Sequence, residues 1–387
     1  MKNELSRRSL MIAGAGAIAA PALAQAPAGP PGPPGAGGPP GAPGGAGRPP
    51  QRPPQPPLTG PQVAPPAAPL GPPYPVVGTI EQLDPSLSEL IDVATPVEKI
   101  LDGFVWVEGP VWIGGKDGYL LCSDTRNNKI VKWQNPGPGK TTNGETWKKP
   151  SGYEGPNNEG WAPNLSEPGT NGIIRARGGL IAADQGNRTV AFINLKTKAK
   201  THLASKFEGK RFNSPNDFVL HKNGMIYFTD PPFGLLNVFN SPDREMDYTG
   251  LFRLNPDNSV TLIDKTLMPN GIGLSPDCSK LYVTDSSGWV VFDLDAKGAA
   301  SNRRVFVDRS VVTGGDGLKI DHLGNMWASS SAGLSIFNPQ GKRIGIIHAD
   351  DRISNCEFGE DGYVYMCSNH RLIRAKVKVK KIFRKNA

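Results

Sequence analysis

The sequence predicts an all-β fold: a six-bladed β-propeller of four-stranded blades, with the ring closed by an N-terminal strand. Three observations predict it. A hairpin pattern recurs six times, further strand-like runs follow the copies, and residues 76–387 show no convincing long amphipathic helix. Hairpin repeats of about forty to fifty residues are typical of propellers, whereas helical solenoids lack these turns.

The start of the chain has to be set aside before the fold is considered. Residues 5–26 place a twin arginine (Arg7, Arg8) before an apolar run that ends in Ala22-Leu23-Ala24. This order predicts an export signal of the twin-arginine type over residues 1–26. The apolar run is short and rich in Gly and Ala, so we expect no stable membrane span after cleavage. The protein is therefore expected to be periplasmic or secreted.

Residues 27–75 are almost entirely Pro, Gly and Ala. A segment of this composition cannot bury apolar surface, which predicts a disordered, extended linker. A tether to an envelope partner is the functional alternative. The remaining residues, 76–387, are then the catalytic propeller domain.

Charge and cysteine content exclude several classes of protein. The net charge is +8, from 43 basic and 35 acidic residues, but seven basic residues lie in the last fourteen. The domain between the ends is near neutral, and no nucleic-acid partner is indicated. The four cysteines have no CxxC spacing, which argues against a zinc or thioredoxin-like site. Cys356 and Cys367 flank a turn where a disulfide would be feasible, but buried free cysteine is the simpler interpretation.

Each copy of the repeat consists of a polar residue, an apolar run, a turn and a second apolar run. One copy reads NDFVLHKNGMIYFTD and another reads DGLKIDHLGNMWASS. The copies begin at Glu108, Asn171, Asn216, Asn270, Asp316 and Asn355, so the spacings are 63, 45, 54, 46 and 39 residues. The sixth copy leaves room for only three strands. We expect its fourth strand from VEKILDG (97–103), because that pairing would cover two exposed edges.

The six polar residues that open the copies have a shared position in this fold. The innermost strand of each blade lines the central channel, so these residues should form a ring at one mouth. Two carboxylates and four amides are oxygen donors that suit Ca²⁺, and the lack of His and Cys argues against zinc. One such residue alone would usually cap backbone, but six in register favour a bound ion. We expect four of the six residues to touch that ion. Asp217, the next residue after Asn216, is expected to point away from the channel.

Connections at the same mouth should shape the pocket. Two are long, residues 150–170 and 231–249, and are predicted to be lids. Arg126 follows the first copy at the mouth and could bind an anionic substrate. Asp184 and Asp230 are expected to cap backbone, with Asp230 also a modest site candidate. Trp112 and Trp327 are expected in the core.

Several motifs in order resemble one known family. They are EGPVW (108–112), NSPNDFVL (213–220), YFTDPPFG (227–234), PNGIGLSPD (269–277), GDGLKIDHLGNMW (315–327) and SNCEFG (354–359). The chain thereby resembles the gluconolactonase/regucalcin (senescence marker protein) family, which includes luciferin-regenerating enzyme, over about residues 95–380. It looks most similar to bacterial gluconolactonase-like proteins.

The resemblance implies roles for individual residues. Glu108, Asn270 and Asp316 match the family's metal ligands, and Asp316 also matches its proposed base or nucleophile. Asn216 matches a position that is either a fourth ligand or a substrate contact, and Asn171 matches an amide near the substrate. Gln185 stands in Asp184-Gln185-Gly186, where bacterial relatives often read Glu-His-Gly. It is expected to contact substrate, and the histidine's absence leaves substrate identity and proton transfer open.

Together these observations predict hydrolysis of a small sugar-type lactone, such as an aldonolactone, by a calcium-dependent enzyme. An ion with open positions would polarise the lactone carbonyl, and Asp316 would act beside it. Zn²⁺, Mg²⁺ and Mn²⁺ stay open as alternatives to calcium. Two rival functions also stay open: an esterase or phosphotriesterase using the same site, and a non-catalytic binding propeller whose ion is structural.

Overall fold

Antiparallel sheets dominate residues 55–156 and 160–382, which are the residues described by this computed structural model. The predicted export signal and the linker up to residue 54 lie outside them. Three short 3-10 helices accompany the strands in this part of the chain: η1 (Pro85–Glu89), η2 (Thr125–Asn127) and η3 (Val238–Asn240). No helix among the described residues is long and apolar enough to cross a bilayer. The predicted all-β class is confirmed.

Four sheets have four strands each, in chain order. The first contains β3 (Val107–Ile113), β4 (Tyr119–Asp124), β5 (Lys129–Trp133) and β6 (Glu145–Lys148). The second contains β7 (Thr170–Ala176), β8 (Gly179–Asp184), β9 (Thr189–Ile193) and β10 (Lys200–Ala204). The third contains β13 (Phe218–Leu220), β14 (Ile226–Asp230), β15 (Gly250–Leu254) and β16 (Val260–Asp264). The fourth contains β17 (Ile272–Leu274), β18 (Lys280–Asp285), β19 (Gly288–Leu294) and β20 (Ala300–Asp308).

The remaining strands form a nine-stranded sheet and a small hairpin. In spatial order the large sheet contains β21 (Leu318–Ile320), β22 (Met326–Ser330), β23 (Gly333–Phe337), β24 (Arg343–Ala349), β1 (Val76–Gln82), β2 (Val97–Asp102), β27 (Arg371–Lys376), β26 (Tyr363–Ser368) and β25 (Asn355–Phe358). The hairpin pairs β11 (Lys206–Phe207) with β12 (Lys210–Arg211).

The hairpin of the third copy shows how the sequence forms these elements. Phe218 pairs with Phe228 and Leu220 with Ile226, which keeps one face of both strands apolar. The turn between them places Gly224 at φ +89°, a conformation that side chains with a Cβ rarely adopt. The predicted hairpin over residues 218–228 is confirmed.

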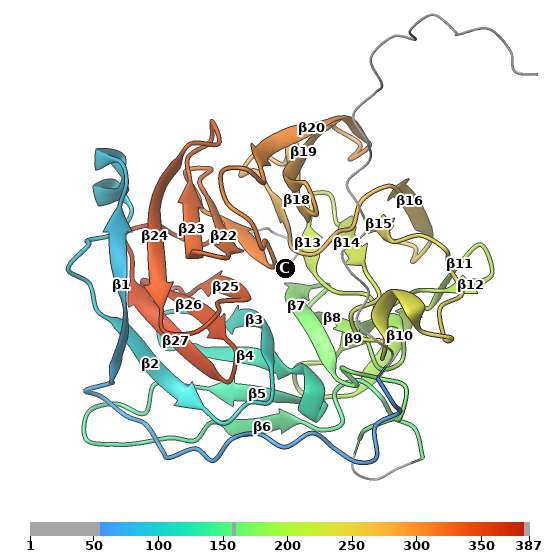
Figure 1. Cartoon of the computed structure of the whole chain (residues 1–387), viewed down its shortest axis with the longest axis horizontal. Coiled ribbons are helices and arrows are strands. Elements are labelled where there is room, and N and C mark those ends of the chain that lie inside the picture. The colour runs from blue at the N-terminus through green and yellow to red at the C-terminus, as the bar shows by residue number, and fades with distance from the viewer. Residues whose placement is uncertain (1–54, 157–159, 383–387) are drawn as a thin grey trace, which may run out of the picture. The chain divides into compact units, whose positions relative to one another are not determined.

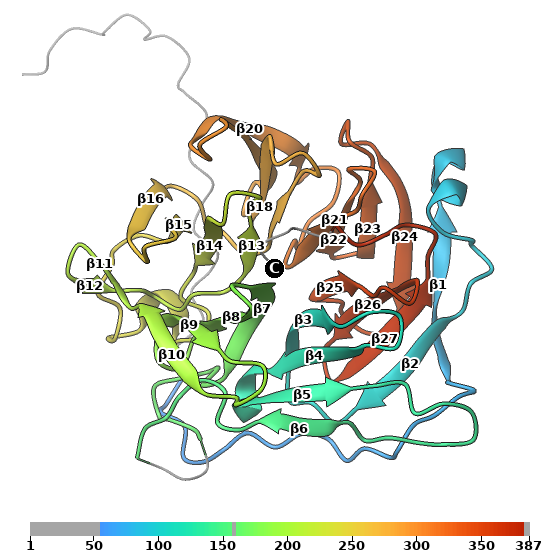
Figure 2. The ribbon, with the colours of Figure 1, turned by 180° about the vertical axis from the view of Figure 1, so that it is seen from behind.

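The first strand of each copy contacts the first strand of the next. β3 contacts β7, and the series continues through β13, β17, β21 and β25, which contacts β3 in turn. Figures 1 and 2 show the strand groups arranged around a common centre. The fold is therefore β-propeller-like, and the first strands are its inner strands.

Strand β2 (Val97–Asp102) lies within the large sheet, with a partner on each side. It pairs with β27, with Glu98 opposite Arg374, and its other edge pairs with β1. β1 in turn pairs with β24, a contact that the sequence did not predict. No backbone edge on this side of the large sheet stays open as a result.

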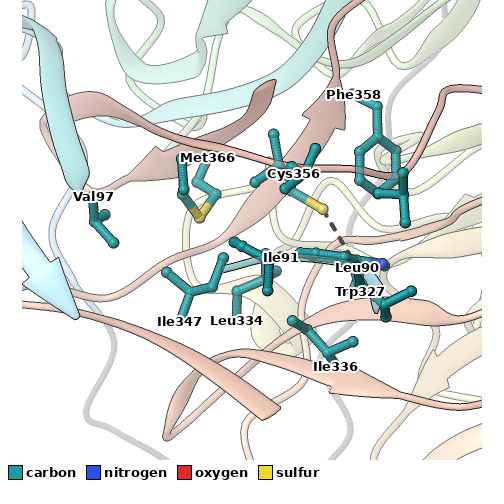
Figure 3. Close-up of a cluster of buried hydrophobic side chains, with 14 of the residues drawn as sticks. Leu90, Ile91, Val97, Trp327, Leu334, Ile336, Ile347, Cys356, Phe358 and Met366 are labelled. Carbon is teal, nitrogen blue, oxygen red and sulfur yellow. Dashed lines mark hydrogen bonds between the residues drawn. The ribbon is translucent and has the colours of Figure 1, made fainter. Parts of the chain in front are cut away.

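Buried apolar side chains pack between neighbouring strand groups. Figure 3 shows one such cluster, in which the rings of Trp327 and Phe358 meet edge to face at 5.4 Å. Cys356 Sγ lies 3.6 Å from the Trp327 carbonyl oxygen. All four cysteines are free and buried, so Cys356 and Cys367 form no disulfide. Trp112 and Trp327 lie in the core, as predicted.

The end of the predicted linker lies against the body in the described residues. Leu58 N donates to Pro163 O, and Gln62 Nε2 donates to Ser166 O. Leu70 forms a bridge with Thr142, and Tyr74 is buried. Residues 163 and 166 belong to the first predicted lid, so this segment contacts it directly.

Candidate functional site

The polar residues that open the six copies lie at one end of the inner strands. Backbone hydrogen bonds join neighbours there: Gly172 N donates to Asn216 O at 2.7 Å, and Gly271 N donates to Asp316 O at 3.0 Å. A side-chain bond joins the last copy to the first, from Asn355 Nδ2 to Glu108 Oε2 at 3.2 Å. The structure thus brings the predicted site residues of different sheets together at what we call the mouth.

A glycine follows four of the six polar residues, Glu108, Asn171, Asn270 and Asp316, and it has a physical role here. A Cβ at Gly109 would lie 1.9 Å from Asn171 O, and one at Gly271 would lie 2.4 Å from Asp316 O. At Gly172 it would lie 2.6 Å from Asn216 O. Glycine is required at these three positions because neighbouring inner strands approach this closely, and Gly109 also has a positive φ of +52°.

Glu108 and Asp316 are the two carboxylates of the mouth. Glu108 Oε2 accepts hydrogen bonds from Gly109 N and Asn355 Nδ2, both at 3.2 Å. Burial, and then the nearby charge of Asp316, raise the pKa of Glu108 to about 8. Burial also raises the pKa of Asp316, although the Arg352 guanidinium and the Asn270 amide act in the opposite direction. Two buried carboxylates that repel each other favour a bound cation.

Arg352 is the counter-charge of Asp316 in the protein itself. Its Nη2 lies 2.7 Å from Asp316 Oδ2, while half of its side chain stays exposed. It comes from the connection between β24 and β25. That connection also lines a polar cavity of about 1070 Å³, open solvent included, together with Gly314, Gly315 and Ser331.

The amides of the mouth differ in how far they are already engaged. Asn171 and Asn216 are buried, and Asn270 is half-buried. Asn355 accepts from Cys356 N at 2.9 Å and from Lys319 Nζ at 3.4 Å, while its amide nitrogen donates to Glu108. The Asn355 side chain is therefore held by protein groups on both its atoms.

Asp217 corrects one expectation. It does not point away from the centre, because Lys319 Nζ, from the inner strand β21, lies 3.6 Å from its Oδ2. Strand β13 begins only at residue 218, so the regular alternation of a strand does not reach Asp217. Asp217 and Lys319 place a buried ion pair next to the mouth.

Arg126 lies at the rim of the mouth. Its guanidinium carbon is 5.2 Å from the ring centroid of Trp106, and that of Arg352 is 5.8 Å from the same ring. Arg126 Nε lies 3.8 Å from Glu167 Oε1. Two cationic groups therefore flank one tryptophan at the entrance.

The predicted lids contact each other. Ser166 N and Glu167 N both donate to Gly234 O, at 3.0 and 3.2 Å, and Leu165 forms a bridge with Leu235. Asp230 accepts from Asn213 N at 2.8 Å and Ser214 N at 2.9 Å, and burial raises its pKa to about 7. It caps the segment before Asn216, as the sequence analysis expected of it.

Asp184 and Gln185 end the second strand of their sheet. Asp184 Oδ2 lies 2.8 Å from Lys200 Nζ, and its Oδ1 accepts from Asn187 N at 2.9 Å, which is again a structural role. Gln185 is fully buried, and neither of its amide atoms has a hydrogen-bond partner within the described protein. Of these two residues, Gln185 is the one whose side-chain amide atoms both lack a hydrogen-bond partner within the described ranges.

Sequence reasoning missed Glu167, Arg352 and Trp106. Glu167 lies within a long loop, where an acidic residue normally reads as solvated, yet it is buried. Arg352 and Trp106 precede inner strands by a few residues, so a search for the strand-opening residues passes over them. Arg352 lies just before the sixth copy and Trp106 just before the first, and this position was the sequence signal that could have found them.

The donor set at the mouth fits a hard divalent cation. Glu108 and Asp316 offer carboxylate oxygens, and Asn216 and Asn270 offer amide oxygens. Within residues 55–156 and 160–382, no group of three or more His, Cys, Asp and Glu residues is placed to hold a metal. The predicted set has only two such residues, so its metal would depend on the amides as well.

A second cavity lies at the opposite end of the inner strands. It has a volume of about 850 Å³, open solvent included, and is lined mainly by apolar side chains such as Val111, Leu220 and Ile320. Glu357 also lines this distal end, but its carboxylate is paired with Lys381 at 3.0 Å, whereas Glu108 and Asp316 at the mouth raise each other's electrostatic cost. We therefore place the candidate site at the mouth, although the distal cavity is the more apolar of the two.

Known proteins match most of the chain. Residues 106–370 match the family model described as SMP-30/Gluconolactonase/LRE-like region. A gluconolactonase from Zymomonas mobilis is 38% identical over 320 residues, which cover 78% of this chain and 87% of that protein. A solved gluconolactonase from Xanthomonas campestris shares the fold at TM-score 0.65 and 24% identity, covering 80% of this chain and all of that one (100%). A calcium-binding regucalcin from Agrobacterium tumefaciens aligns at TM-score 0.54 and 16% identity, covering 73% and 93%.

Proposed function

The chain belongs to the SMP-30/gluconolactonase/LRE family, and on that premise we propose that it is a metal-dependent lactonase that opens a small sugar-type lactone, such as an aldonolactone. The pair of buried carboxylates at the mouth carries the proposal. Burial raises the pKa of Glu108 and the charge of Asp316 raises it further, so a bound cation would offset this electrostatic cost.

Calcium is the ion that we propose, held by Glu108, Asn216, Asn270 and Asp316. All four offer oxygen, the donor that hard cations prefer, and none offers nitrogen or sulfur for zinc. The regucalcin that shares this fold is named a calcium-binding protein, which supports the choice. Metal analysis of the purified protein would separate calcium from Zn²⁺, Mg²⁺ and Mn²⁺.

The residues of the mouth divide the reaction between them. When bound, the ion would polarise the lactone carbonyl and lower the pKa of the attacking water. Asp316 accepts a proton from that water as its oxygen bonds to the carbonyl carbon. The ring C–O bond then breaks, the departing ring oxygen takes the proton from Asp316 and becomes an alcohol, and the new carboxylic acid releases its proton to solvent and becomes a carboxylate. Asn171 and Asn216 orient the ring, and Arg126 faces the carboxylate that forms.

The arrangement of the strands supports a complete propeller. We propose six blades, of which five are β3–β6, β7–β10, β13–β16, β17–β20 and β21–β24. The sixth combines β25–β27 with β2, which closes the ring from the N-terminal side. We also propose export through the twin-arginine signal, with residues 27–75 as the linker, and hence a periplasmic or secreted enzyme. The possible envelope partner of the linker remains a prediction.

One experiment tests the activity. The purified protein is assayed on a panel of aldonolactones, aryl esters and phosphotriesters, in calcium and in EDTA. We expect turnover of aldonolactones that EDTA abolishes and calcium restores. Full activity in EDTA would refute metal dependence. Turnover of esters or phosphotriesters alone would favour the esterase alternative, and calcium binding without turnover would favour a binding propeller.

A further inference from the structure

Glu167 is a third carboxylate beside the mouth, and the two lids fix its position. Its backbone N–H donates to Gly234 O of the second lid, and Gly169 N, two residues later, donates to Thr125 O of the 3-10 helix η2. Only 7% of Glu167 is exposed. A loop residue held in this way has a defined side-chain position rather than a solvated one.

The charges of the mouth reach Glu167. Arg126 Nε lies 3.8 Å from Glu167 Oε1 and supplies a counter-charge. Burial raises the pKa of Glu167 to about 7, and the charge of Asp316 adds to this. Burial likewise raises the pKa of Glu108, with a smaller contribution from the charge of Glu167. Glu167 therefore lies within electrostatic reach of both predicted carboxylate ligands, although no hydrogen bond joins it to either among the described residues.

Unpartnered polar atoms gather at this place. Glu167 Oε2 and both amide atoms of Gln185 are buried without a hydrogen-bond partner in the described protein. Gln185 lies close enough to lower the pKa of Glu167, but the two side chains do not meet in hydrogen-bond geometry. A buried polar atom without a partner is costly, so three such atoms together favour a partner from outside the chain.

The chemistry of these atoms selects the partner. A carboxylate oxygen accepts, and a primary amide offers one acceptor and two donors. A hydroxyl group both donates and accepts, so neighbouring hydroxyls on a sugar ring match this set. A bare aliphatic ring would leave all three atoms unpaired.

We propose that Glu167 and Gln185 bind ring hydroxyls of the substrate and thereby select polyhydroxylated lactones over unsubstituted ones. Arg126 acts as a positioning residue that holds Glu167 by charge. The inference rests on the proposed lactonase function and names the substrate class of the same site.

The test compares two lactones with the same ring. Glucono-δ-lactone carries hydroxyls and δ-valerolactone carries none, and both are assayed with the calcium-loaded full chain. We expect Glu167→Ala and Gln185→Ala each to lower kcat/KM on glucono-δ-lactone about 10- to 100-fold, mostly through KM. On δ-valerolactone the change should stay within about threefold. If one variant fails to fold, the other carries the test.

Glu154→Gln is the matched control. Glu154 lies in the same loop, half-exposed, and pairs with Lys200 at 3.2 Å. Its substitution should leave both activities unchanged. Calcium affinity, measured by titration calorimetry, should fall by less than about tenfold in Glu167→Ala, because a nearby negative charge is lost but no ligand is.

Three results would overturn the proposal. Equal losses on both lactones would show that Glu167 and Gln185 do not read hydroxyls, while the lactonase function would stand. A loss of calcium affinity of more than about 100-fold in Glu167→Ala would make Glu167 a metal ligand instead. A wild-type protein inactive on both lactones would overturn the lactonase function and the hydroxyl assignment with it.

Discussion

The two ends of the inner strands carry opposite chemistry. At the mouth, buried carboxylates and amides from different sheets meet within hydrogen-bond distance. At the distal end, the same strands present Val111, Leu220 and Ile320 to a mainly apolar cavity. Both ends are built from one repeated hairpin, so the difference comes from the first residue of each copy.

This difference separates function from stability. Burying charge without full pairing costs free energy. A protein keeps such charges at a site where a ligand or a reaction needs them. Apolar burial at the distal end contributes about 25 cal/mol for each Å² removed from water. Substitutions at the mouth should therefore change chemistry, and those toward the distal end should change stability.

The largest expected effect comes from comparing a carboxylate at the mouth, Asp316, with one at the distal end, Glu357. Asp316→Asn should lower kcat/KM for an aldonolactone by about 10³-fold, or about 4 kcal/mol, because a ligand and proton acceptor are lost together. Glu357→Gln is the control, since Glu357 lines the distal cavity and pairs with Lys381 at 3.0 Å. It should retain activity within about threefold. Similar losses in both would contradict the division between the ends.

A core deletion should have the reverse effect. Phe358 is buried against Trp327, and Phe358→Ala should lower the free energy of unfolding by about 3–5 kcal/mol. The folded fraction should keep its kcat. Denaturant unfolding followed by fluorescence measures the change, with Asn171→Ala as the mouth control. If Asn171→Ala destabilises as much as Phe358→Ala, the mouth contributes to stability after all.

Calcium should stabilise the whole protein, but only through its proposed site at the mouth. At a calcium concentration of about 100 times Kd, the wild type should gain about 2.7 kcal/mol over its EDTA-treated form. Asp316→Asn should gain much less, and Phe358→Ala should gain as much as wild type. Thermal unfolding in calcium and in EDTA measures these gains, and equal melting temperatures for wild type in both would refute a bound ion.

The smallest expected effect, counted per pH unit, is the pH dependence of the free energy of unfolding. Burial raises the pKa of Asp230 to about 7, so the folded state holds a proton that the unfolded state releases near pH 4. This stability is present below about pH 4 and is lost as the pH rises through about 7, by at most about 1.4 kcal/mol per pH unit. Asp230→Asn removes the contribution, so the stability of wild type relative to this variant should fall over that range. Parallel pH curves would contradict it.

Sequence patterns predicted the hairpins because their causes are local. Alternation and a Lys-Asn-Gly turn suffice to predict the pairing of Phe218 with Phe228. The ring of polar residues was also predictable, because a shared position in a repeat implies a shared position in space. Strand β2 could be expected next to β27 because a blade with three strands leaves an edge open.

The failures have physical reasons too. Asp217 was placed wrongly because alternation holds only inside a regular strand, and it precedes one. Asn355 belongs to the ring by sequence, yet Lys319 and Glu108 already engage its side chain. Glu167 was missed because only the contact between two distant loops buries it.

The sequence by itself determined the repeated hairpin, the oxygen-donor residue that opens each copy, and the glycine that lets neighbouring strands approach. Each of these depends on residues close together in the chain. Only the tertiary structure decided which oxygen donors are already paired, which carboxylates repel each other, and which loop supplies a third carboxylate. Those properties depend on burial and on distances between sheets, which residues far apart in sequence set together.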